Sequence, residues 1–283
     1  MSDKIPYVIV TPGYDTNHGG IVALHKLCHL LNAKGYEAYV LLVIDNRLSP
    51  AFNTPQITST DMISDIVKTR RGIVLYPDIV KENFLGSLRP VGFVALVSQS
   101  QTRPYPVTFY WEACLMPPDM DKNKYLIRID VADRTLFVKD DSITKDIDTV
   151  WLGKAQLDGV VNDIKGDNIV EITYAYPKDR KELATLLKRS KLFYTYDHNT
   201  LMAEEAMLCG AIPVCVPNKS QYAKEWVNGI VTKERYGFAQ NTSVQEIERA
   251  RSTADLAIQE FYRRTAGTEE DMVNNFIKVT QDM

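Results

Sequence analysis

The chain has 283 residues, of which 45% are hydrophobic and 24% charged, and its 33 basic residues nearly balance its 36 acidic ones. This composition is typical of a globular protein with a core. It excludes a disordered chain and any overall charge that would draw the protein to nucleic acid or anionic membranes. Apolar runs such as residues 93–97 are far shorter than the roughly 18 residues that cross a bilayer, and the first residues lack a signal-peptide core. We therefore expect a cytoplasmic protein of about two domains without stable membrane insertion.

Residues 5–110 alternate between strand and helix patterns. An apolar run at 7–11 predicts a strand, apolar residues at helical spacing over 21–31 predict a helix that Gly35 ends, and 37–44 predicts the next strand. The same criteria predict further strands at 73–76 and 91–97 and a helix at 61–68. Alternation of this kind builds a parallel sheet, so we expect an α/β fold.

The second half of the chain repeats this pattern after an irregular stretch. Between 98 and 130 prolines interrupt a set of aromatic residues, and the alternation over 128–138 predicts strands that lead to a second domain. There we expect strands near Val150, at 169–174, near Phe193 and near Val214, and a final helix at 269–282 that packs back on the first domain. The resulting domains are 1–145 and 146–265, with a C-terminal helix at 266–283.

The segment 191–217 places acidic residues in a strand–helix–strand unit. A β-branched and aromatic run precedes an apolar helix that ends at Gly210, and a second apolar run follows. Asp197 and Glu205 are separated by seven residues, and Thr200 lies at the first turn of the helix. A helix that begins at the carboxyl edge of a sheet favours anionic ligands through its free N–H groups. The alternative is that Asp197 caps the helix and the glutamates are solvated residues of its first turns.

A second polar segment follows the first predicted strand. Residues 12–20 have the sequence PGYDTNHGG and lead directly into the predicted helix. Gly19 and Gly20 permit a tight turn and a close approach of the backbone to a diphosphate, although a simple strand-to-helix turn explains them equally well. The ring of His18 can accept a proton or donate a hydrogen bond to a sugar hydroxyl or phosphate oxygen, or it belongs to a solvated loop residue.

Polar and aromatic residues in two loops are candidates for contact with a sugar acceptor, because aromatic faces stack on sugar rings. They are Tyr14, Asp15, Asn17 and Trp111. Turns also select Asp and Asn for conformational reasons, and packing between elements explains an aromatic residue at least as well.

Residues 149–154, TVWLGK, predict an apolar strand that ends in a glycine and a cation. A positive charge beside a departing diphosphate stabilises the negative charge that develops as the bond breaks, which makes Lys154 a candidate. A single lysine after a strand is more often a solvated charge. Arg180 and Lys181 lie in a stretch that we expect to begin a surface helix capped by Asp179.

The spacing in the segment 191–217 resembles the Glu-x7-Glu segment of retaining GT-B glycosyltransferases. The matching positions are Asp197, Glu205, Ala206, Cys209, Gly210 and Pro213. In that family the second glutamate binds the ribose hydroxyls of a nucleotide sugar. Glu205 matches it and is preferred over Glu204 by its register with Gly210, whereas Asp197 replaces the first glutamate. The Gly19-Gly20 loop and the strand that ends at Lys154 are similar to the elements that face the donor diphosphate in that family.

The resemblance implies two Rossmann-like α/β domains that face a cleft. The reaction it implies is transfer of a sugar from a nucleoside diphosphate sugar to an acceptor hydroxyl, with retention and without a metal ion or other cofactor. It implies catalytic roles for His18, Asp197 and Lys154. The implied donor contacts are Gly19, Gly20, Lys154, Thr200, Leu201 and Glu205, and the implied acceptor contacts are Tyr14, Asp15, Asn17 and Trp111.

The acceptor stays open at the level of sequence. A glycan is favoured by family frequency, and a modified base in DNA is the alternative, because compact members of this fold glycosylate DNA. The aspartate in place of the first glutamate also permits a non-catalytic module that binds a sugar nucleotide or glycan, and an epimerase is the fold's other enzymatic use. Basic clusters at 68–71 and 188–191 are more typical of a solvated face than of a DNA-binding surface. The sequence does not indicate an oligomeric state.

Overall fold

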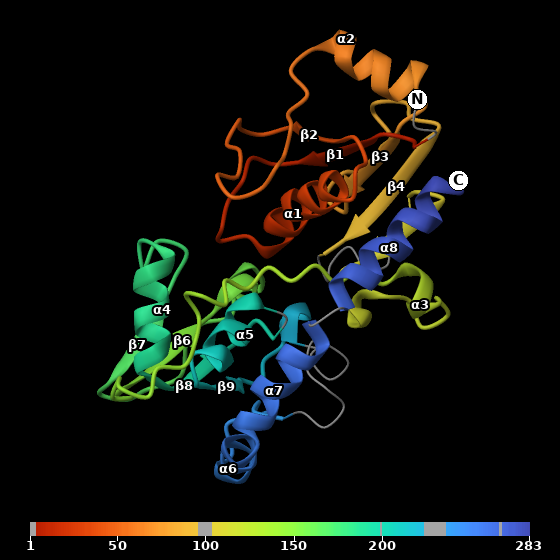
Figure 1. Ribbon diagram of the computed structural model, residues 1–283. Coiled ribbons are helices and arrows are strands. Elements are labelled where there is room, and N and C mark those ends of the chain that lie inside the picture. The colour runs from red at the N-terminus through yellow and green to blue at the C-terminus, as the bar shows by residue number, and fades with distance from the viewer. Residues whose placement is uncertain (1–3, 96–103, 199, 224–235, 266–267) are drawn as a thin grey trace. The chain divides into compact units, whose positions relative to one another are not determined.

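The computed structural model describes residues 4–95, 104–198, 200–223, 236–265 and 268–283. The chain forms two compact units, one of Met1–Val131 with Gly267–Met283 and the other of Ala132–Ala266. Each unit is built on a parallel β-sheet with helices packed against it (Figure 1). The predicted architecture of two Rossmann-like α/β domains is therefore confirmed.

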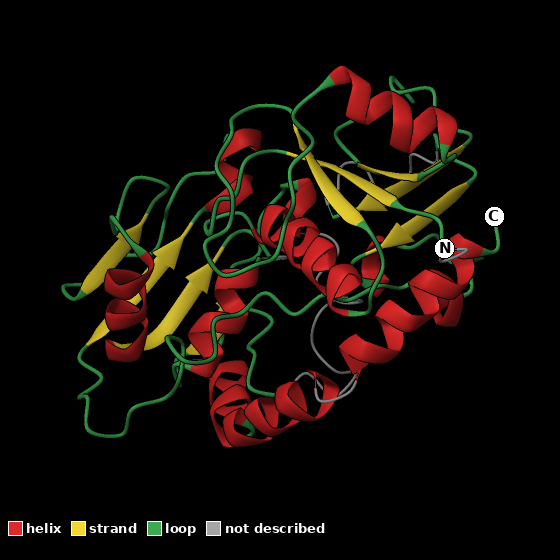
Figure 2. Ribbon diagram, turned by 45° about the horizontal axis from the view of Figure 1, so that its top comes forward, coloured by secondary structure: helices red, strands yellow, loops and turns green. Residues whose placement is uncertain are grey.

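The sheet of the first unit has five parallel strands in the order β2-β1-β3-β4-β5. Their bounds are Tyr7–Thr11 (β1), Ala38–Leu42 (β2), Ile73–Pro77 (β3), Arg89–Val94 (β4) and Val107–Tyr110 (β5). Successive residues of β1 enter different cores: Tyr7 and Ile9 pack with the helices α1 (Gly19–Ala33) and α8 (Thr268–Gln281), and Val8 packs with the short helices α2 (Thr60–Ile63) and η1 (Ser64–Thr69). Helices thus cover both faces (Figure 2), which is why every residue of β1 is buried.

The last helix belongs to the first unit although it follows the second unit in sequence. The ring of Phe276 in α8 lies 4.8 Å from the ring of Phe109 and 5.9 Å from that of Tyr7, measured between centroids. The Tyr7 hydroxyl is 2.8 Å from Thr280 Oγ1 in the buried interior. The predicted return of the C-terminal helix is therefore confirmed. Neither α8 nor any other helix in the described ranges combines the length and apolar character that crossing a membrane requires.

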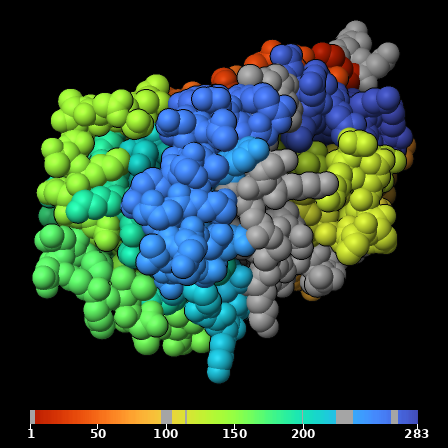
Figure 3. All heavy atoms as spheres, turned by 90° about the horizontal axis from the view of Figure 1, so that it is seen from below, coloured from red at the N-terminus to blue at the C-terminus, as the bar shows by residue number. Residues whose placement is uncertain are grey.

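The second unit has a four-stranded parallel sheet in the order β7-β6-β8-β9. Its strands are Ile147–Trp151 (β6), Ile169–Ile172 (β7), Ser190–Thr195 (β8) and Ile212–Cys215 (β9). Its helices are Arg180–Arg189 (α4), Leu201–Leu208 (α5), Val244–Ser252 (α6) and Ala254–Thr265 (α7), with 3₁₀ turns at Gly153–Asp158 (η4) and Gln221–Ala223 (η5). Phe193 of β8 packs in a core with Leu187 of α4 and Ala206 of α5. Figure 3 shows α6 and α7 in blue on one face of this unit; the darker blue spheres belong to α8.

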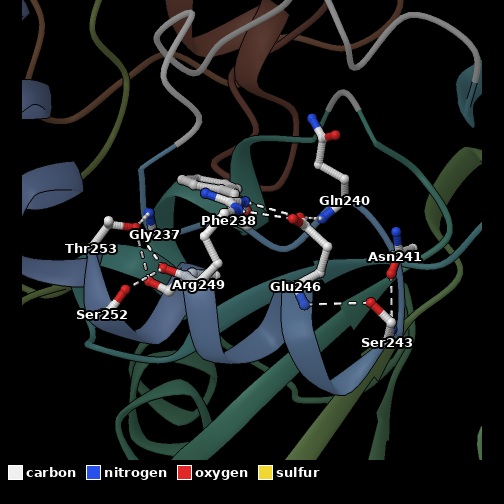
Figure 4. A network of polar contacts seen from close by, with 10 residues as sticks. Gly237, Phe238, Gln240, Asn241, Ser243, Glu246, Arg249, Ser252 and Thr253 are labelled. Carbon is white, nitrogen blue, oxygen red and sulfur yellow. Dashed lines mark hydrogen bonds and ion pairs between the residues drawn. The ribbon is translucent and has the colours of Figure 1, made fainter.

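Residues 238–240 lie beside β9 and are bonded to helix α6. Ala239 pairs with that strand, and the flanking Phe238 carbonyl accepts a hydrogen bond of 2.6 Å from the Arg249 guanidinium (Figure 4). The Glu246 carboxylate pairs with Arg249 at 2.8 Å and accepts the Gln240 N–H at 3.1 Å. This network fastens α6 to the edge of the sheet.

Three details differ from the sequence-based expectations. The units divide between Val131 and Ala132 rather than between 145 and 146, because Phe137 is fully buried in the second core. Residues 128–138 form no strand: Ile129 packs in the core of the first unit and Phe137 in that of the second, and residues 134–136 between them form a turn. Conversely, β5 lies within the stretch expected to be irregular, since prolines near it masked a short edge strand.

Candidate functional site

A lysine–aspartate pair lies at the carboxyl edge of the second sheet. β6 and β8 are parallel neighbours, so the residues that follow their last residues, Trp151 and Thr195, meet at the same edge. The Lys154 ammonium lies 2.8 Å from Asp197 Oδ2, and the Lys154 backbone N–H donates to the same oxygen at 3.1 Å. The aspartate side chain is 2% exposed and the lysine side chain 25% exposed. Lysine is therefore the accessible member, and the aspartate fixes the position of its charge.

Gly153 allows this pair to form. Its φ is +55°, a left-handed conformation that residues with a Cβ rarely adopt. A Cβ at this position would also lie 2.5 Å from the indole nitrogen of Trp151 and 2.6 Å from Asp197 Cβ. Both the backbone and the available space therefore require glycine before Lys154.

The pair itself and the residues near it in the chain include buried polar atoms without a hydrogen bond. Among the described residues, Trp151 Nε1, Asp197 Oδ1 and Glu205 Oε2 are buried and make no hydrogen bond. Buried donors and acceptors are nearly always paired, with water or a ligand where the protein supplies no partner. This edge therefore combines a cation with an indole donor and one carboxylate oxygen, Asp197 Oδ1, that make no hydrogen bond within the described part of the protein.

Helix α5 begins beside the pair with an open N-terminus. Thr200 is its N-cap residue and Leu201 its first residue, and within the described chain no side chain caps it. Its first N–H groups therefore point toward this edge with their partial positive charge. The alternative interpretation of Asp197 as the helix cap is wrong, because its carboxylate is bonded to Lys154 instead.

Glu205 lies on α5 in the interior of the second unit. Its carboxylate is fully buried and forms an ion pair with the Arg180 guanidinium, which in turn lies 4.5 Å from the centroid of the Phe137 ring. Burial raises the pKa of Glu205 to about 7, although the Arg180 charge opposes that rise. Glu204, the competing candidate, is also buried, so exposure does not distinguish the two glutamates.

The loop between β8 and α5 is tied to the segment after β9. The His198 ring lies between two carbonyls, with Nδ1 2.8 Å from the oxygen of Ala223 and Nε2 2.9 Å from that of Val216. Burial lowers the pKa of His198, against the pull of these carbonyls. The Tyr222 ring from the same segment lies 5.6 Å from the Lys154 ammonium. These contacts hold the surroundings of Lys154 in place.

In the first unit, Asp15 organises the loop that follows β1. Its Oδ2 is 2.9 Å from His18 Nδ1, and its Oδ1 accepts the Asn17 N–H at 2.9 Å. The His18 side chain is 53% exposed. In the tautomer in which Nδ1–H donates to Asp15, Nε2 is an exposed acceptor, so this arrangement can receive a proton or bind a hydroxyl.

Gly19 and Gly20 are the first two residues of α1, and neither has a positive φ. The expected tight turn is therefore not built by these glycines. The close approach in this loop occurs at Gly13, where a Cβ would collide with the Asp45 carboxylate. His18 is the N-cap residue, and its side chain does not cap the helix, so α1 presents an open N-terminus next to the two glycines.

Two expected acceptor residues are packed against other side chains. The Tyr14 ring lies edge-on to the rings of His25 and Phe52, with centroids 5.3 and 5.9 Å apart. The Trp111 indole donates to the Ile129 carbonyl at 3.0 Å. Trp111 follows β5, three strands from β1, which places it roughly 14 Å from the loop that contains Tyr14. The structure thus does not bring these two residues together, and their acceptor roles stay predictions.

Two residues of this site were not selected from the sequence. Arg180 was assigned to a surface helix, and no local pattern indicates that the first residue of α4 reaches α5. Trp151 offered a signal, because a large aromatic residue ends a buried strand directly before Gly153 and Lys154. Its indole N–H requires a polar partner when it is buried.

The described residues contain no group of three or more His, Cys, Asp or Glu side chains placed to hold a metal ion. His25 and His29 lie four residues apart on α1, a spacing that can place two metal ligands on one face of a helix. His25 Nε2 is 3.1 Å from the Pro12 carbonyl, and His29 Nδ1 accepts the Asn53 N–H at 3.1 Å. Both rings therefore make contacts with loops.

No protein-family model and no curated protein matches this sequence. Among solved structures, the chain is similar to the glycotransferase of kitacinnamycin at 12% identity and a TM-score of 0.45, covering 98% of this chain and 97% of that chain. An alpha-glucosyltransferase in complex with UDP and a 13-mer DNA containing an HMU base matches at 14% identity and a TM-score of 0.45, covering 98% and 95%. A spinosyn rhamnosyltransferase matches at 11% identity and a TM-score of 0.44, covering 98% and 100%. At identities and TM-scores this low, the likeness assigns no activity to this chain.

Proposed function

We propose that this protein is a glycosyltransferase that transfers a sugar from a nucleoside diphosphate sugar to an acceptor hydroxyl. The second unit holds most of the donor and the first unit most of the acceptor. The observation that carries this proposal is the Lys154 ammonium, fixed by Asp197 beside the unpaired Trp151 N–H and the open N-terminus of α5. Ligands of doubly wound sheets bind at this edge, and these groups attract phosphate oxygens.

The roles of the residues follow from their chemistry. Lys154 stabilises the negative charge that develops on the departing diphosphate, and the N–H groups of Thr200 and Leu201 bind its oxygens. Asp197 positions Lys154 through Oδ2, and its unpaired Oδ1 accepts a hydroxyl of the donor sugar. The cation and helix terminus together supply the charge that a metal ion supplies elsewhere, so the reaction proceeds without a metal ion.

Glu205 binds the ribose hydroxyls in this proposal through its unpaired Oε2. Because Glu205 is fully buried, a ribose reaches it only if the Arg180 side chain swings away from the carboxylate. Donor binding is therefore coupled to a rearrangement at the first turn of α4.

On the acceptor side, His18 acts as the polar group nearest the reaction, oriented by Asp15. Gly19 and Gly20 let the acceptor or the diphosphate approach the open N-terminus of α1 closely, while Tyr14 and Asn17 line the same loop. We propose a glycan acceptor and transfer with retention in the cytoplasm. DNA that carries a hydroxylated base is the alternative acceptor.

The test begins with thermal unfolding in the presence of a panel of nucleoside diphosphates and nucleotide sugars, because a ligand that binds the native state raises the unfolding temperature. One nucleotide sugar should stabilise the protein selectively and be slowly hydrolysed to the nucleoside diphosphate. Lys154→Met should abolish both effects, whereas Lys165→Met removes an exposed charge of the same unit as a matched control.

Product analysis then distinguishes the activities. Sugar transfer to a glycan or to hydroxymethylated DNA supports the proposal and identifies the acceptor class, and the anomeric configuration of the product tests retention. Stabilisation without hydrolysis or transfer would instead indicate a binding module. Stabilisation by none of the nucleotides would refute the donor site.

A further inference from the structure

A pocket lies at the edge of the second sheet opposite to the Lys154–Asp197 pair. It has a volume of about 390 Å³, and its apolar lining includes Gly210, Ile212 and Ile258. Two lining residues lie where strands begin: Ile212 is the first residue of β9, and Lys191 is the second residue of β8. The pocket is therefore at the amino edge of the sheet. The Lys154–Asp197 pair is at the carboxyl edge. Strands of this length separate the two edges by roughly 15–20 Å, which makes the pocket distinct from the donor site.

Four cationic side chains from separate parts of the chain line this pocket. They are Lys139, Lys145, Lys191 and Arg251, and they are accompanied by one carboxylate, that of Asp255. From the sequence, the cluster at 188–191 is expected to be a solvated face, and Lys191 is indeed exposed. It also lines this pocket together with cations that lie far away in sequence.

Lys145 fixes one positive charge in the pocket wall. Its ammonium donates to the carbonyls of Lys188, Ser190 and Cys209 at 3.0, 3.0 and 3.1 Å. These carbonyls lie at the ends of α4 and α5, where helix C-termini carry partial negative charge. Burial lowers the pKa of Lys145, and the neighbouring Lys139 charge lowers it further. Lys139 and Lys145 therefore repel each other, although Asp141 and Asp255 raise the pKa of Lys139, and an anion bound beside the two lysines would relieve the remaining repulsion.

The other cations are available to a ligand. Lys139 and Arg251 contact Asp141 and Glu248, whose side chains are 84% and 58% exposed, and such surface ion pairs contribute little. The Lys191 side chain is exposed, and after the paired Arg189 its charge also helps to lower the pKa of the nearby Asp146. A ligand with several negative charges can therefore engage three side chains at once without breaking a strong interaction.

We propose that this pocket binds adjacent phosphate groups of one ligand. The excess of cations matches a multiply charged anion better than a single carboxylate, and lysine ammonium groups act as point charges toward phosphate. The apolar lining suits the uncharged part of such a ligand. Two sources supply this chemistry: a free nucleoside polyphosphate, or consecutive phosphodiesters of a nucleic acid strand. This site is independent of the proposed glycosyltransferase activity.

The test uses the full chain carrying Lys154→Met, so that phosphate binding at the donor site does not contribute. The probes are inorganic tripolyphosphate, ATP and a short fluorescein-labelled DNA strand. Calorimetry measures binding of the first two and fluorescence anisotropy binding of the strand, each at low and physiological salt. The variant is Lys139→Gln with Lys191→Gln. Its matched control is Lys165→Gln with Lys181→Gln, which removes two exposed charges elsewhere in the same unit. Glutamine removes the charge but keeps a polar side chain, and Lys145 is left intact because its ammonium bonds the carbonyls at the helix ends.

We expect tripolyphosphate to bind the parent, the pocket variant to weaken it by about tenfold or more, and the control to change it by less than about twofold. If the DNA strand binds and tripolyphosphate competes with it, the source is a nucleic acid; if ATP binds and the strand does not, the source is a free nucleotide. No binding of any probe overturns the proposal, as does equal weakening by the pocket variant and the control. If the protein did not transfer sugars at all, the binding of these probes to the pocket would be expected to be the same.

Discussion

The replacement Glu205→Gln should stabilise this protein at alkaline pH and leave its stability nearly unchanged at acidic pH. Glu205 is fully buried, and its pKa of about 7 lies above the value of 4.5 that is usual for a glutamate in water. The folded state therefore holds the proton more tightly than the unfolded state. The stabilisation is complete below the unfolded pKa, and it is lost as the pH rises through about 7.

The magnitude follows from the size of that shift. At about 1.4 kcal/mol per pKa unit, the change from 4.5 to about 7 corresponds to roughly 3 kcal/mol between the acidic and alkaline limits. Glutamine resembles the protonated acid in shape and hydrogen bonding and does not ionise. The free energy of unfolding of Glu205→Gln should therefore exceed that of the parent by roughly 3 kcal/mol at pH about 9 and match it at pH about 4.

The assay is urea unfolding of the parent and of Glu205→Gln across this pH range, with Glu248→Gln as a control. Glu248 is an exposed residue in a surface pair, so its replacement should change the free energy by less than about 0.5 kcal/mol at every pH. A difference between Glu205→Gln and the parent that does not depend on pH would refute the reasoning. Destabilisation of Glu205→Gln that grows with pH would show that the Arg180 ion pair outweighs burial and that the pKa is lowered.

Three further outcomes are expected. Gly153→Ala should destabilise the protein by about 1–3 kcal/mol and impair nucleotide binding, because alanine disfavours the positive φ and collides with Trp151 and Asp197; thermal unfolding with and without nucleotide measures both effects. Burial lowers the pKa of His25, so the parent loses stability as the pH falls below about 6.5, and His25→Gln should flatten the slope of unfolding free energy between pH about 7 and 5. Phe276→Ala in α8 should cost about 3–5 kcal/mol in urea unfolding, since its ring is fully buried against the first sheet; a loss under about 1 kcal/mol would mean that α8 is dispensable there.

The sequence was sufficient for the local elements and for their order. Apolar periodicity predicted β1, α1 and the two parallel sheets, and the spacing at 269–282 predicted the helix that returns to the first unit. These features depend on residues close together in the chain, whose pattern of burial repeats with the period of a strand or helix. The Gly153-Lys154 pair and the spacing of Asp197 and Glu205 identified the carboxyl edge of the second sheet for the same reason.

Tertiary structure alone decided which side chains meet and which charges they carry. Lys154 and Asp197 touch because β6 and β8 are neighbours, and Arg180 reaches Glu205 because α4 packs beside α5; no local pattern specifies either contact. Burial then raises the pKa of Glu205, an effect that depends on atoms from the whole unit rather than on adjacent residues. The sequence determined where polar groups can occur along the chain. The fold decided which of them meet, because the packing of distant segments sets both the distances between charges and their exposure to water.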